Sequence, residues 1–270
     1  MSVSVKGASI CLIGAGRMGG ALLRGWLAAG VPPKALTVQE PNPSPEVAQL
    51  VQQLSIASAA RETPDVLVLA VKPQILPDVL KQAAIHAGPK TVTLSIAAGR
   101  TVASIAQHLP SDSAIVRAMP NLPAEIGRGI AALFANAHVT ADQKELCETL
   151  MRAVGDAVWI ADESLMDAIT AVSGSGPAYL FYFLECLTAA ARDAGLPDDL
   201  ASELAKATVT GSAELLSRSV LSAAQLRENV TSPGGTTAAG LSVLMREGGL
   251  KELLAETVKA AARRSRELSQ

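Results

Sequence analysis

The hydrophobic residues in the first part of the chain fall in short runs separated by helical patterns. The runs predict β-strands at Ala8–Ile13, Leu36–Gln39, Val66–Val71, Thr91–Ile96, Ala114–Met119, Ile130–Ala135 and Ala157–Ile160. Helices are expected at Ala21–Ala29, Ile75–His86 and Val102–Leu109, with one more before the last strand. Val66–Val71 is apolar throughout, which is typical of a central parallel strand covered on both faces. Strands that alternate with helices predict an α/β fold built on a doubly wound sheet.

The pattern changes after Asp162, and the rest of the chain shows only helical patterns broken by Gly, Ser and Pro. Helices are expected at Pro197–Leu216, Ala223–Asn229, Gly235–Arg246 and Leu250–Leu268. We therefore predict two domains, with the sheet in residues 1–162 and an all-helical domain in residues 163–270.

The longest apolar helix of the second domain is expected directly after Ser173–Pro177. Four of the five Phe and Tyr residues of the chain lie within Tyr179–Phe183. A helix that is apolar on every side must be covered on every side, and a domain of this size has limited core of its own. We therefore expect a second copy of the chain to cover this helix in an interlocked homodimer.

Composition narrows the classes of partner. The 270 residues carry a formal net charge of −2 without a basic stripe, which argues against nucleic acid. Cys11, Cys147 and Cys186 are far apart and form no CxxC motif, so free thiols in a reducing compartment are expected. The N-terminus lacks the pattern of a signal peptide, and Glu185 interrupts the most apolar stretch, Leu180–Ala191. We expect a soluble cytoplasmic protein that does not span a membrane.

A glycine motif, Gly14-Ala-Gly-Arg-Met-Gly19, follows the first predicted strand and leads into the first predicted helix. In such a motif the first glycine permits a tight turn, the second lets the backbone approach a pyrophosphate, and the third lets helix and strand pack closely. Glycine clusters also form ordinary loops, but the flanking strand and helix are the setting that dinucleotide binding requires. We therefore predict a Rossmann-type dinucleotide-binding domain.

Glu40 follows the second predicted strand, where an acidic residue usually accepts hydrogen bonds from the adenosine ribose and favours NAD. No Arg or Lys lies between Glu40 and Leu54 to hold the 2′-phosphate of NADP. A shift of one residue in register would make Glu40 a solvated loop residue instead. The preference between NADH and NADPH therefore stays open, with Glu40 favouring NADH only slightly.

Ligands of parallel sheets lie at the carboxyl ends of the strands. Val71, Lys72 and Pro73 follow a buried strand, so we expect them to border the cofactor. Lys72 could equally be an ordinary surface lysine. Two further predicted strands end in Ala97-Ala-Gly99 and Pro120-Asn121.

The segment Val230-Thr-Ser-Pro-Gly-Gly-Thr-Thr237 is rich in hydroxyl groups and glycine and carries no charge. Pro233 suits the first turn of a helix, where its missing N–H costs nothing. Gly234 and Gly235 allow the backbone to approach a ligand closely. An ordinary capped helix is one reading of this segment, and a site for a carboxylate or phosphate at the helix N-terminus is the other.

Few side chains of the sequence suit acid–base catalysis. His86, His108 and His138 lie at helix ends or in loops away from the glycine motifs, and we interpret them as surface residues. They lack metal-ligand spacing, so no metal site is expected. Dehydrogenases of hydroxy acids normally need a His or Lys to manage the hydroxyl proton. A dinucleotide-binding domain without such a residue suits hydride transfer to a protonated C=N bond.

Two motifs, Val172-Ser-Gly-Ser-Gly-Pro-Ala-Tyr179 and Val230–Thr237, closely resemble segments of pyrroline-5-carboxylate reductase. Residues 13–19, 70–73, 96–99 and 117–121 are also similar to that family's segments, in the same order, so that the resemblance covers nearly the whole chain. It implies an enzyme of proline biosynthesis that reduces the cyclic imine 1-pyrroline-5-carboxylate with NADPH or NADH. The implied fold is a Rossmann-type domain followed by a helical domain that interlocks into homodimers, which often assemble into decamers.

The resemblance also implies site residues. The substrate is expected to contact Glu163, Val230, Thr231, Ser232, Gly235, Thr236 and Thr237. The cofactor is expected to contact Gly14, Ala15, Gly16, Arg17, Met18, Gly19, Glu40, Ala70, Val71, Lys72, Pro73, Ala97, Asn121 and Asn229. Thr237 is the expected catalytic residue, with its hydroxyl or a nearby water supplying or steadying the proton on the ring nitrogen. Glu163 would help to hold an iminium or the amine product, unless it is only a solvated loop residue.

Three alternatives remain. Leu122 stands where the family commonly has Thr, and Arg218–Ser222 lacks an acidic, glycine-containing loop, so a related cyclic imine could be the substrate. A β-hydroxyacid dehydrogenase would need a Lys early in the second domain, but none lies between Pro177 and Lys206. A non-catalytic nucleotide-binding regulatory protein would have little reason to keep Thr231–Thr237 intact.

Overall fold

A computed structural model describes residues 7–58 and 63–268. The chain divides into two compact units, one formed by Met1–Ser175 with Ala261–Gln270 and the other by Gly176–Ala260. The first unit therefore continues beyond Asp162, where the sequence pattern predicts the end of the first domain, and takes in the end of the chain. The predicted domain boundary stays a prediction, because the division into units reports packing alone.

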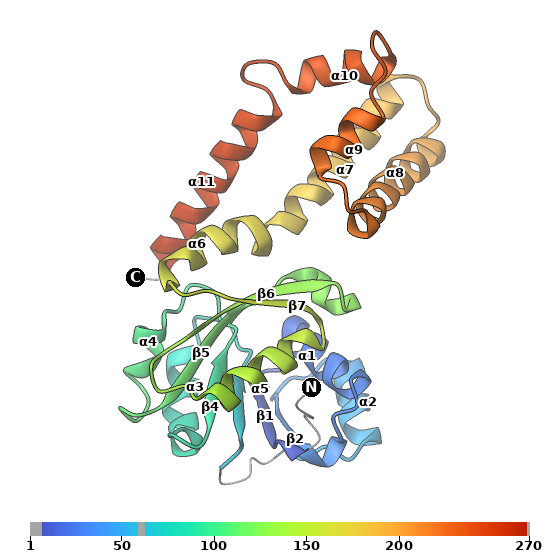
Figure 1. The fold of residues 1–270 in the computed structure, drawn as a ribbon. Coiled ribbons are helices and arrows are strands. Elements are labelled where there is room, and N and C mark those ends of the chain that lie inside the picture. Colours follow the sequence, from blue (N-terminus) through green and yellow to red (C-terminus); the bar gives the residue numbers. More distant parts are fainter. Residues whose placement is uncertain (1–6, 59–62, 269–270) are drawn as a thin grey trace. The chain divides into compact units, whose positions relative to one another are not determined.

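The first unit is built on a sheet whose seven described strands have the order β2-β1-β3-β4-β5-β6-β7 (Figure 1). The strands are β1 (Ile10–Ile13), β2 (Leu36–Gln39), β3 (Val66–Leu69), β4 (Val92–Ser95), β5 (Ala114–Met119), β6 (Gly129–Ala135) and β7 (Gly155–Trp159). The first five are parallel to one another. The predicted doubly wound α/β fold is confirmed, and each strand lies within about two residues of its predicted bounds.

Strand β6 runs antiparallel to β5, and β7 is parallel to β6. A parallel crossover needs a dozen or more residues, and the connection between β5 and β6 is shorter. It consists of the 3₁₀ turn η4 (Leu122–Ile126) and Gly127, which reverses the chain with a φ of 69°. The sheet therefore changes direction where the sequence pattern alone shows only one more apolar run.

Helices cover both faces of the sheet, because alternate strand residues point to opposite faces. Ile10 and Leu12 belong to a core that also contains Trp26 and Leu150, whereas Cys11 belongs to a second core with other side chains. The first core includes residues of α1 (Arg17–Ala28), α2 (Pro45–Gln53) and α5 (Ala141–Arg152). The second includes residues of α3 (Leu76–Ala83) and α4 (Val102–Ala106). Two separate cores of this kind are what a doubly wound sheet produces.

The second unit consists of helices (Figure 1). They are α7 (Gly176–Asp193), α8 (Asp198–Arg218), α9 (Ala223–Asn229), α10 (Thr236–Leu244) and most of α11 (Leu250–Leu268). Before them, the short helix α6 (Met166–Ile169) and a wider turn at Thr170–Gly174 belong to the first unit.

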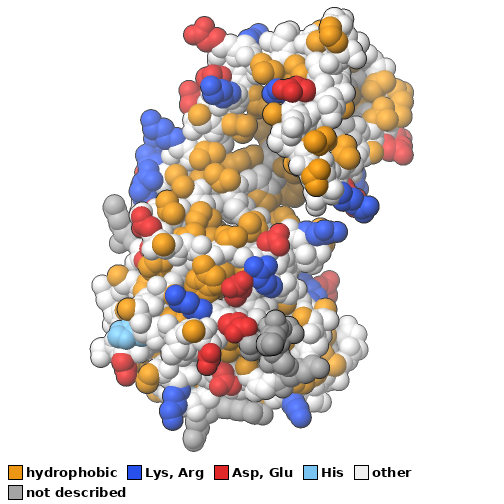
Figure 2. Space-filling view, in the orientation of Figure 1, with side chains coloured by type: hydrophobic (Ala, Val, Ile, Leu, Met, Phe, Trp, Pro, Cys, Tyr) orange, Lys and Arg blue, Asp and Glu red, His pale blue; other side chains and the backbone are white. Residues whose placement is uncertain are grey.

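Helix α7 is the apolar helix that we expect a second copy of the chain to cover. Although it is described in full, it has no buried residue in the single chain. The side chains of Phe181, Tyr182 and Phe183 are 51%, 67% and 42% exposed. Hydrophobic side chains are correspondingly visible on the helices of this unit in Figure 2. In the single chain, the apolar surface of α7 is therefore exposed, although its sequence predicts that it is buried.

In the described residues 7–58 and 63–268, no helix is long and apolar enough to cross a membrane.

Candidate active site

The carboxyl ends of the parallel strands meet at one edge of the sheet. Backbone hydrogen bonds tie these ends together, from Gly14 N to the Gln39 carbonyl (2.8 Å) and from Ala70 N to the Ile13 carbonyl (2.8 Å). Most of the predicted cofactor residues follow these strands directly, namely Gly14, Ala15, Gly16, Arg17, Met18, Gly19, Glu40, Ala70, Val71, Lys72, Pro73, Ala97 and Asn121. Asn229 is the exception, since it lies in the helical unit.

Two of the three motif glycines are required by the fold itself. Gly14 has a φ of +92°, and a Cβ there would lie 2.6 Å from the carbonyl oxygen of Ala70. A Cβ on Gly19 would collide with the carbonyl oxygen of Gly14. These contacts bring the start of α1 directly against the ends of β1 and β3.

Gly16 differs from its neighbours because a Cβ there would meet no described atom within 4 Å. It is the N-cap of α1 with an extended backbone, and it has no side chain that could accept hydrogen bonds from the first N–H groups of the helix. The open space lies at the positive end of the helix, where backbone N–H groups can hold an anion. The residues present therefore fit the pyrophosphate of a dinucleotide, and Gly16 keeps the surface low enough for it to approach.

The carboxylate of Glu40 faces the glycine motif. Its Oε2 accepts a hydrogen bond from the backbone N–H of Ala15 (2.9 Å), and its Oε1 accepts one from the backbone N–H of Asn42 (3.0 Å). Strand β2 ends at Gln39, so Glu40 occupies the position expected of a ribose-binding residue. It is thus held at the edge of the sheet, as its predicted role requires, and is not a freely solvated loop residue.

Two other predicted cofactor residues make contacts within the protein. Arg17 Nε lies 2.8 Å from Glu125 Oε1 in η4. Asn121 Oδ1 accepts from the backbone N–H of Ile130 (2.9 Å), and its Nδ2 donates to Ser173 Oγ (3.3 Å). Asn121 therefore joins the end of β5 to β6 and to the turn before α7. This structural role of Asn121 could not be predicted from the sequence.

Glu163 belongs to an internal ion pair in the first unit. Its Oε1 accepts from Arg117 Nη1 (2.9 Å) and from the backbone N–H of Val102 (2.8 Å). Arg117 is only 3% exposed, and its Nη2 has no hydrogen-bond partner among the described residues. Because a buried guanidinium needs a counter-charge, Glu163 stabilises the end of β5 and the start of α4. The sequence analysis named Glu163 as a site residue but did not predict its ion pair with Arg117.

The hydroxyl-rich segment forms a turn followed by a helix. The backbone N–H of Gly235 donates to the Ser232 carbonyl (3.0 Å), and Gly234 has a φ of +70°. These features, with Pro233 at the second position, are typical of a type II turn. The prediction that Pro233 lies in the first turn of the helix is wrong, because α10 begins at Thr236. The turn needs an extended Pro233, which the helix would not permit.

The start of α10 is open. Its N-cap is Gly235, which carries no side chain, and none of the described side chains caps the helix. Thr236 and Thr237 occupy the first turn and are exposed. Thr231 is directed elsewhere, since its Oγ1 donates to the Arg227 carbonyl (2.6 Å) at the end of α9. The uncapped N–H groups and the hydroxyls of these two exposed threonines form a suitable site for a carboxylate.

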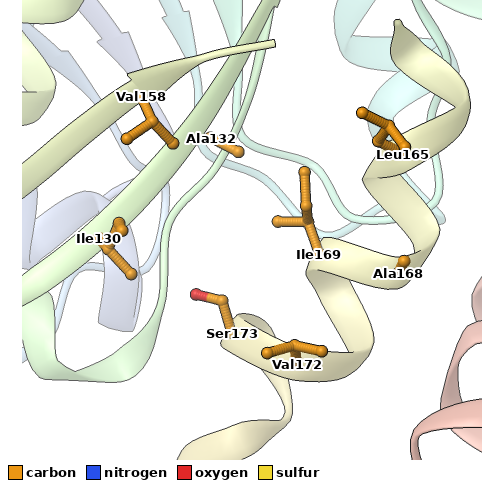
Figure 3. A pocket seen from close by; sticks show the side chains of 8 residues that line it. All are labelled: Ile130, Ala132, Val158, Leu165, Ala168, Ile169, Val172 and Ser173. Atoms are coloured by element: carbon orange, nitrogen blue, oxygen red, sulfur yellow. The ribbon is translucent and has the colours of Figure 1, made fainter. Parts of the chain in front are cut away.

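Two hollows in the described part of the chain contain few of these polar residues. One of about 390 Å³ lies within the first unit (Figure 3) and is lined by Ile130, Ala132, Val158, Leu165, Ala168, Ile169, Val172 and Ser173. All of these side chains except that of Ser173 are hydrocarbon, so the hollow does not suit a charged substrate. A second, of about 300 Å³, lies in the helical unit and includes only Thr231 among the predicted substrate residues.

We also considered a cysteine nucleophile and a metal site. Burial raises the pKa of the Cys11 thiol to about 11 and also raises the pKa of Cys147, so both stay protonated at neutral pH. Across the described ranges, no group of three or more His, Cys, Asp or Glu side chains could hold a metal ion.

Comparisons with known proteins identify the family. Residues 163–268 match a family model described as pyrroline-5-carboxylate reductase dimerisation, and residues 9–99 match one described as NADP oxidoreductase, coenzyme F420-dependent. Pyrroline-5-carboxylate reductase from Pseudomonas aeruginosa is 39% identical over 97% of this chain and 97% of its own length. The chain belongs to the pyrroline-5-carboxylate reductase family.

Further pyrroline-5-carboxylate reductases are similar in sequence and in structure. The one from Synechocystis is 41% identical over 95% of this chain and 97% of its own length. The structure of the one from Coxiella burnetii superposes with a TM-score of 0.89 at 36% identity and covers 97% of this chain and 99% of its own. The Plasmodium falciparum structure, with NADP bound, has a TM-score of 0.83 at 28% identity and covers 98% and 99%. The Rossmann-type sheet and the helical C-terminal part are thus shared with this family.

Gly16→Ala should separate dinucleotide binding from folding. Its Cβ meets open space, so the free energy of unfolding should change by less than about 0.5 kcal/mol. Affinity for NADH or NADPH, measured by nicotinamide fluorescence, should fall by at least about tenfold, because the pyrophosphate can no longer approach. Gly19→Ala is the matched comparison and should lose about 1–3 kcal/mol of stability. Undiminished binding by the Gly16→Ala variant would contradict the assignment.

Glu163→Ala should destabilise the fold whether or not ligand is present. Removing this carboxylate leaves buried Arg117 without its counter-charge, so urea denaturation should show a loss of about 3 kcal/mol. Glu125→Ala, which removes the partner of the 75% exposed Arg17, should cost less than about 1 kcal/mol. Equal losses for the two variants would show that Glu163 does not support Arg117.

Proposed function

We propose that the chain catalyses the NAD(P)H-dependent reduction of 1-pyrroline-5-carboxylate to L-proline, the last step of proline biosynthesis. The observation that carries this proposal is the likeness, over 95–97% of the chain, to proteins named pyrroline-5-carboxylate reductase. It spans both the sheet and the helical unit, so it includes the parts that would hold cofactor and substrate.

The cofactor would bind at the carboxyl edge of the sheet. Gly16 would leave room for the pyrophosphate at the start of α1, while Gly14 and Gly19 let the helix pack against the strands, and Glu40 would accept hydrogen bonds from the adenosine ribose. Once bound, NAD(P)H supplies a hydride from its nicotinamide C4. The further proposed contacts of the cofactor are with Val71, Lys72, Pro73, Ala97, Asn121 and Asn229.

The substrate carboxylate would bind at the start of α10. This end of the helix is uncapped, and its backbone N–H groups and partial positive charge favour an anion. The type II turn before it exposes the hydroxyls of Ser232, Thr236 and Thr237. Val230 and Thr231 complete the proposed substrate contacts.

The proton on the ring nitrogen would be managed by Thr237, directly or through a water molecule. A protonated C=N bond is already a strong electrophile, so the site needs no strongly basic residue. Hydrogen bonds that hold the imine in place and electrostatic stabilisation provide the remaining rate enhancement. The Oε1 of Glu163 accepts from Arg117 and Val102, so a direct contact of Glu163 with the iminium would have to use its Oε2.

Thr237→Ala should reduce turnover by about ten- to a thousandfold if its hydroxyl is a positioned donor. Thr237→Ser keeps a hydroxyl and should retain most of the activity. The measurement is NAD(P)H oxidation with pyrroline-5-carboxylate, run beside a 3-hydroxy acid with NAD(P)⁺ as the test of a dehydrogenase. Absence of imine turnover by the wild-type protein would exclude the proposed function, and an active Thr237→Ala variant would remove Thr237 from the mechanism.

The second partner would be another copy of the chain. Residues 163–268 match a dimerisation domain, and the aromatic side chains of α7 are largely exposed in the single chain. We propose an interlocked homodimer that assembles further into a decamer, in the cytoplasm, where the free cysteines would stay reduced.

Sedimentation at micromolar concentration should give at least twice the chain mass of 27.7 kDa. Tyr182→Glu places a charge on the bare face of α7 and should shift the protein toward monomer, since an unpaired charge in an apolar interface is costly. Lys144→Glu, on α5 of the other unit, is the control and should not change the mass. A stable wild-type monomer would refute the assembly.

A further inference from the structure

The segment after β2 offers few donors to an anion. Prolines at positions 41, 43 and 45 have no backbone N–H. The N–H of Asn42 donates to Glu40 Oε1 (3.0 Å), and that of Val47 donates to Ser44 Oγ (3.3 Å). Although α2 begins at Pro45, its N-terminus is therefore poorly equipped to hold a phosphate, which needs several N–H groups or a cation.

The same segment carries negative charge. Glu40 is fixed beside the glycine motif, because Ala15 donates to its Oε2, and Glu46 lies in the first turn of α2. A carboxylate held in this way can accept hydrogen bonds from the two hydroxyls of an adenosine ribose. It would repel the charge of a 2′-phosphate at the same position.

The segment itself supplies no basic side chain that could offset this charge. The sequence has no Lys or Arg from Glu40 to Ser58, and Arg61 falls outside the described residues. Arg17 lies against Glu125. Arg24 is in the second turn of α1 and reaches back one turn toward the start of the helix, with its Nη1 3.4 Å from where a Cβ on Gly20 would lie. That position is also 3.3 Å from Val47 in the first turn of α2, so Arg24 is a cation whose effect on NADPH binding must be tested.

We infer that this chain uses NADH in preference to NADPH, with Glu40 as the residue that sets the preference. The inference rests on the proposed reduction but concerns the adenosine end of the cofactor, far from the reacting atoms. It also separates this chain from a family model described as NADP oxidoreductase and from a relative with NADP bound. The inferred preference rests on one acidic residue and on a segment poor in N–H donors.

The experiment is a titration of the full-length protein with NADH and with NADPH, without imine, followed by nicotinamide fluorescence. Wild-type protein should bind NADH at least about tenfold more tightly. Glu40→Gln keeps the shape of the side chain and removes its charge, so the ratio of the two dissociation constants should fall toward one, mainly through tighter NADPH binding. Glu46→Gln is the matched control and should change the ratio by less than about threefold.

Each outcome decides the matter. Equal or tighter binding of NADPH by the wild type, or an unchanged ratio in Glu40→Gln, would overturn the inference. Weaker NADPH binding by Arg24→Ala, with NADH binding unchanged, would also overturn it, by showing that Arg24 reaches the 2′-phosphate. Because no imine is present, a preference for NADH without imine turnover would leave this inference standing and refute only the proposed reduction.

Discussion

The structure of the first unit depends on one close approach of backbone to backbone. At Gly14 and Gly19 the start of α1 lies so near the ends of β1 and β3 that a side chain would collide with backbone. This contact directs the N-terminal N–H groups of α1 toward the carboxyl edge of the sheet, and it brings Ala15 within hydrogen-bonding distance of Glu40. The proposed positions of the pyrophosphate and of the ribose therefore depend on the same packing. Gly16 stands apart because the protein alone gives no steric reason for it.

A second constraint is the buried charge of Arg117. Removing a guanidinium from water is costly unless a carboxylate compensates, and Glu163 provides that carboxylate from the segment after the last strand. The same carboxylate oxygen receives the N–H of Val102 at the start of α4. The end of β5, the start of α4 and the segment after β7 are thus held together by a single acidic side chain.

Much of this architecture could be predicted from the sequence, because burial leaves a direct pattern. Strands β2 and β5 and helices α9 and α11 have their predicted bounds. The direction of β6 could not be predicted, since an apolar run looks the same in either direction. Helix α2 was missed because Pro43 and Pro45 suggest a loop, although Ser44 caps the helix from the position between them.

Some features of the candidate site could likewise be predicted from the sequence, and others could not. The glycine motif and Glu40 were predictable, since their geometry follows from a strand, a turn and a helix that adjoin in sequence. The pairing of Arg117 with Glu163 was not, because its partners are 46 positions apart. The bend at Pro233 was misread, as proline is compatible both with a helix start and with a type II turn. Helix α7 was recognised as apolar, but only the structure shows that its own chain leaves it uncovered.

Direct transfer of a hydride from nicotinamide C4 to the imine carbon is the step on which the proposed function depends. The most direct measurement uses NADH carrying deuterium on one or the other face of C4, with pyrroline-5-carboxylate in ordinary water and mass spectrometry of the product. Direct transfer predicts proline with one deuterium on C5 from one of the two labelled cofactors and none from the other. Proline without label from both cofactors, or label found only in the solvent, would contradict it.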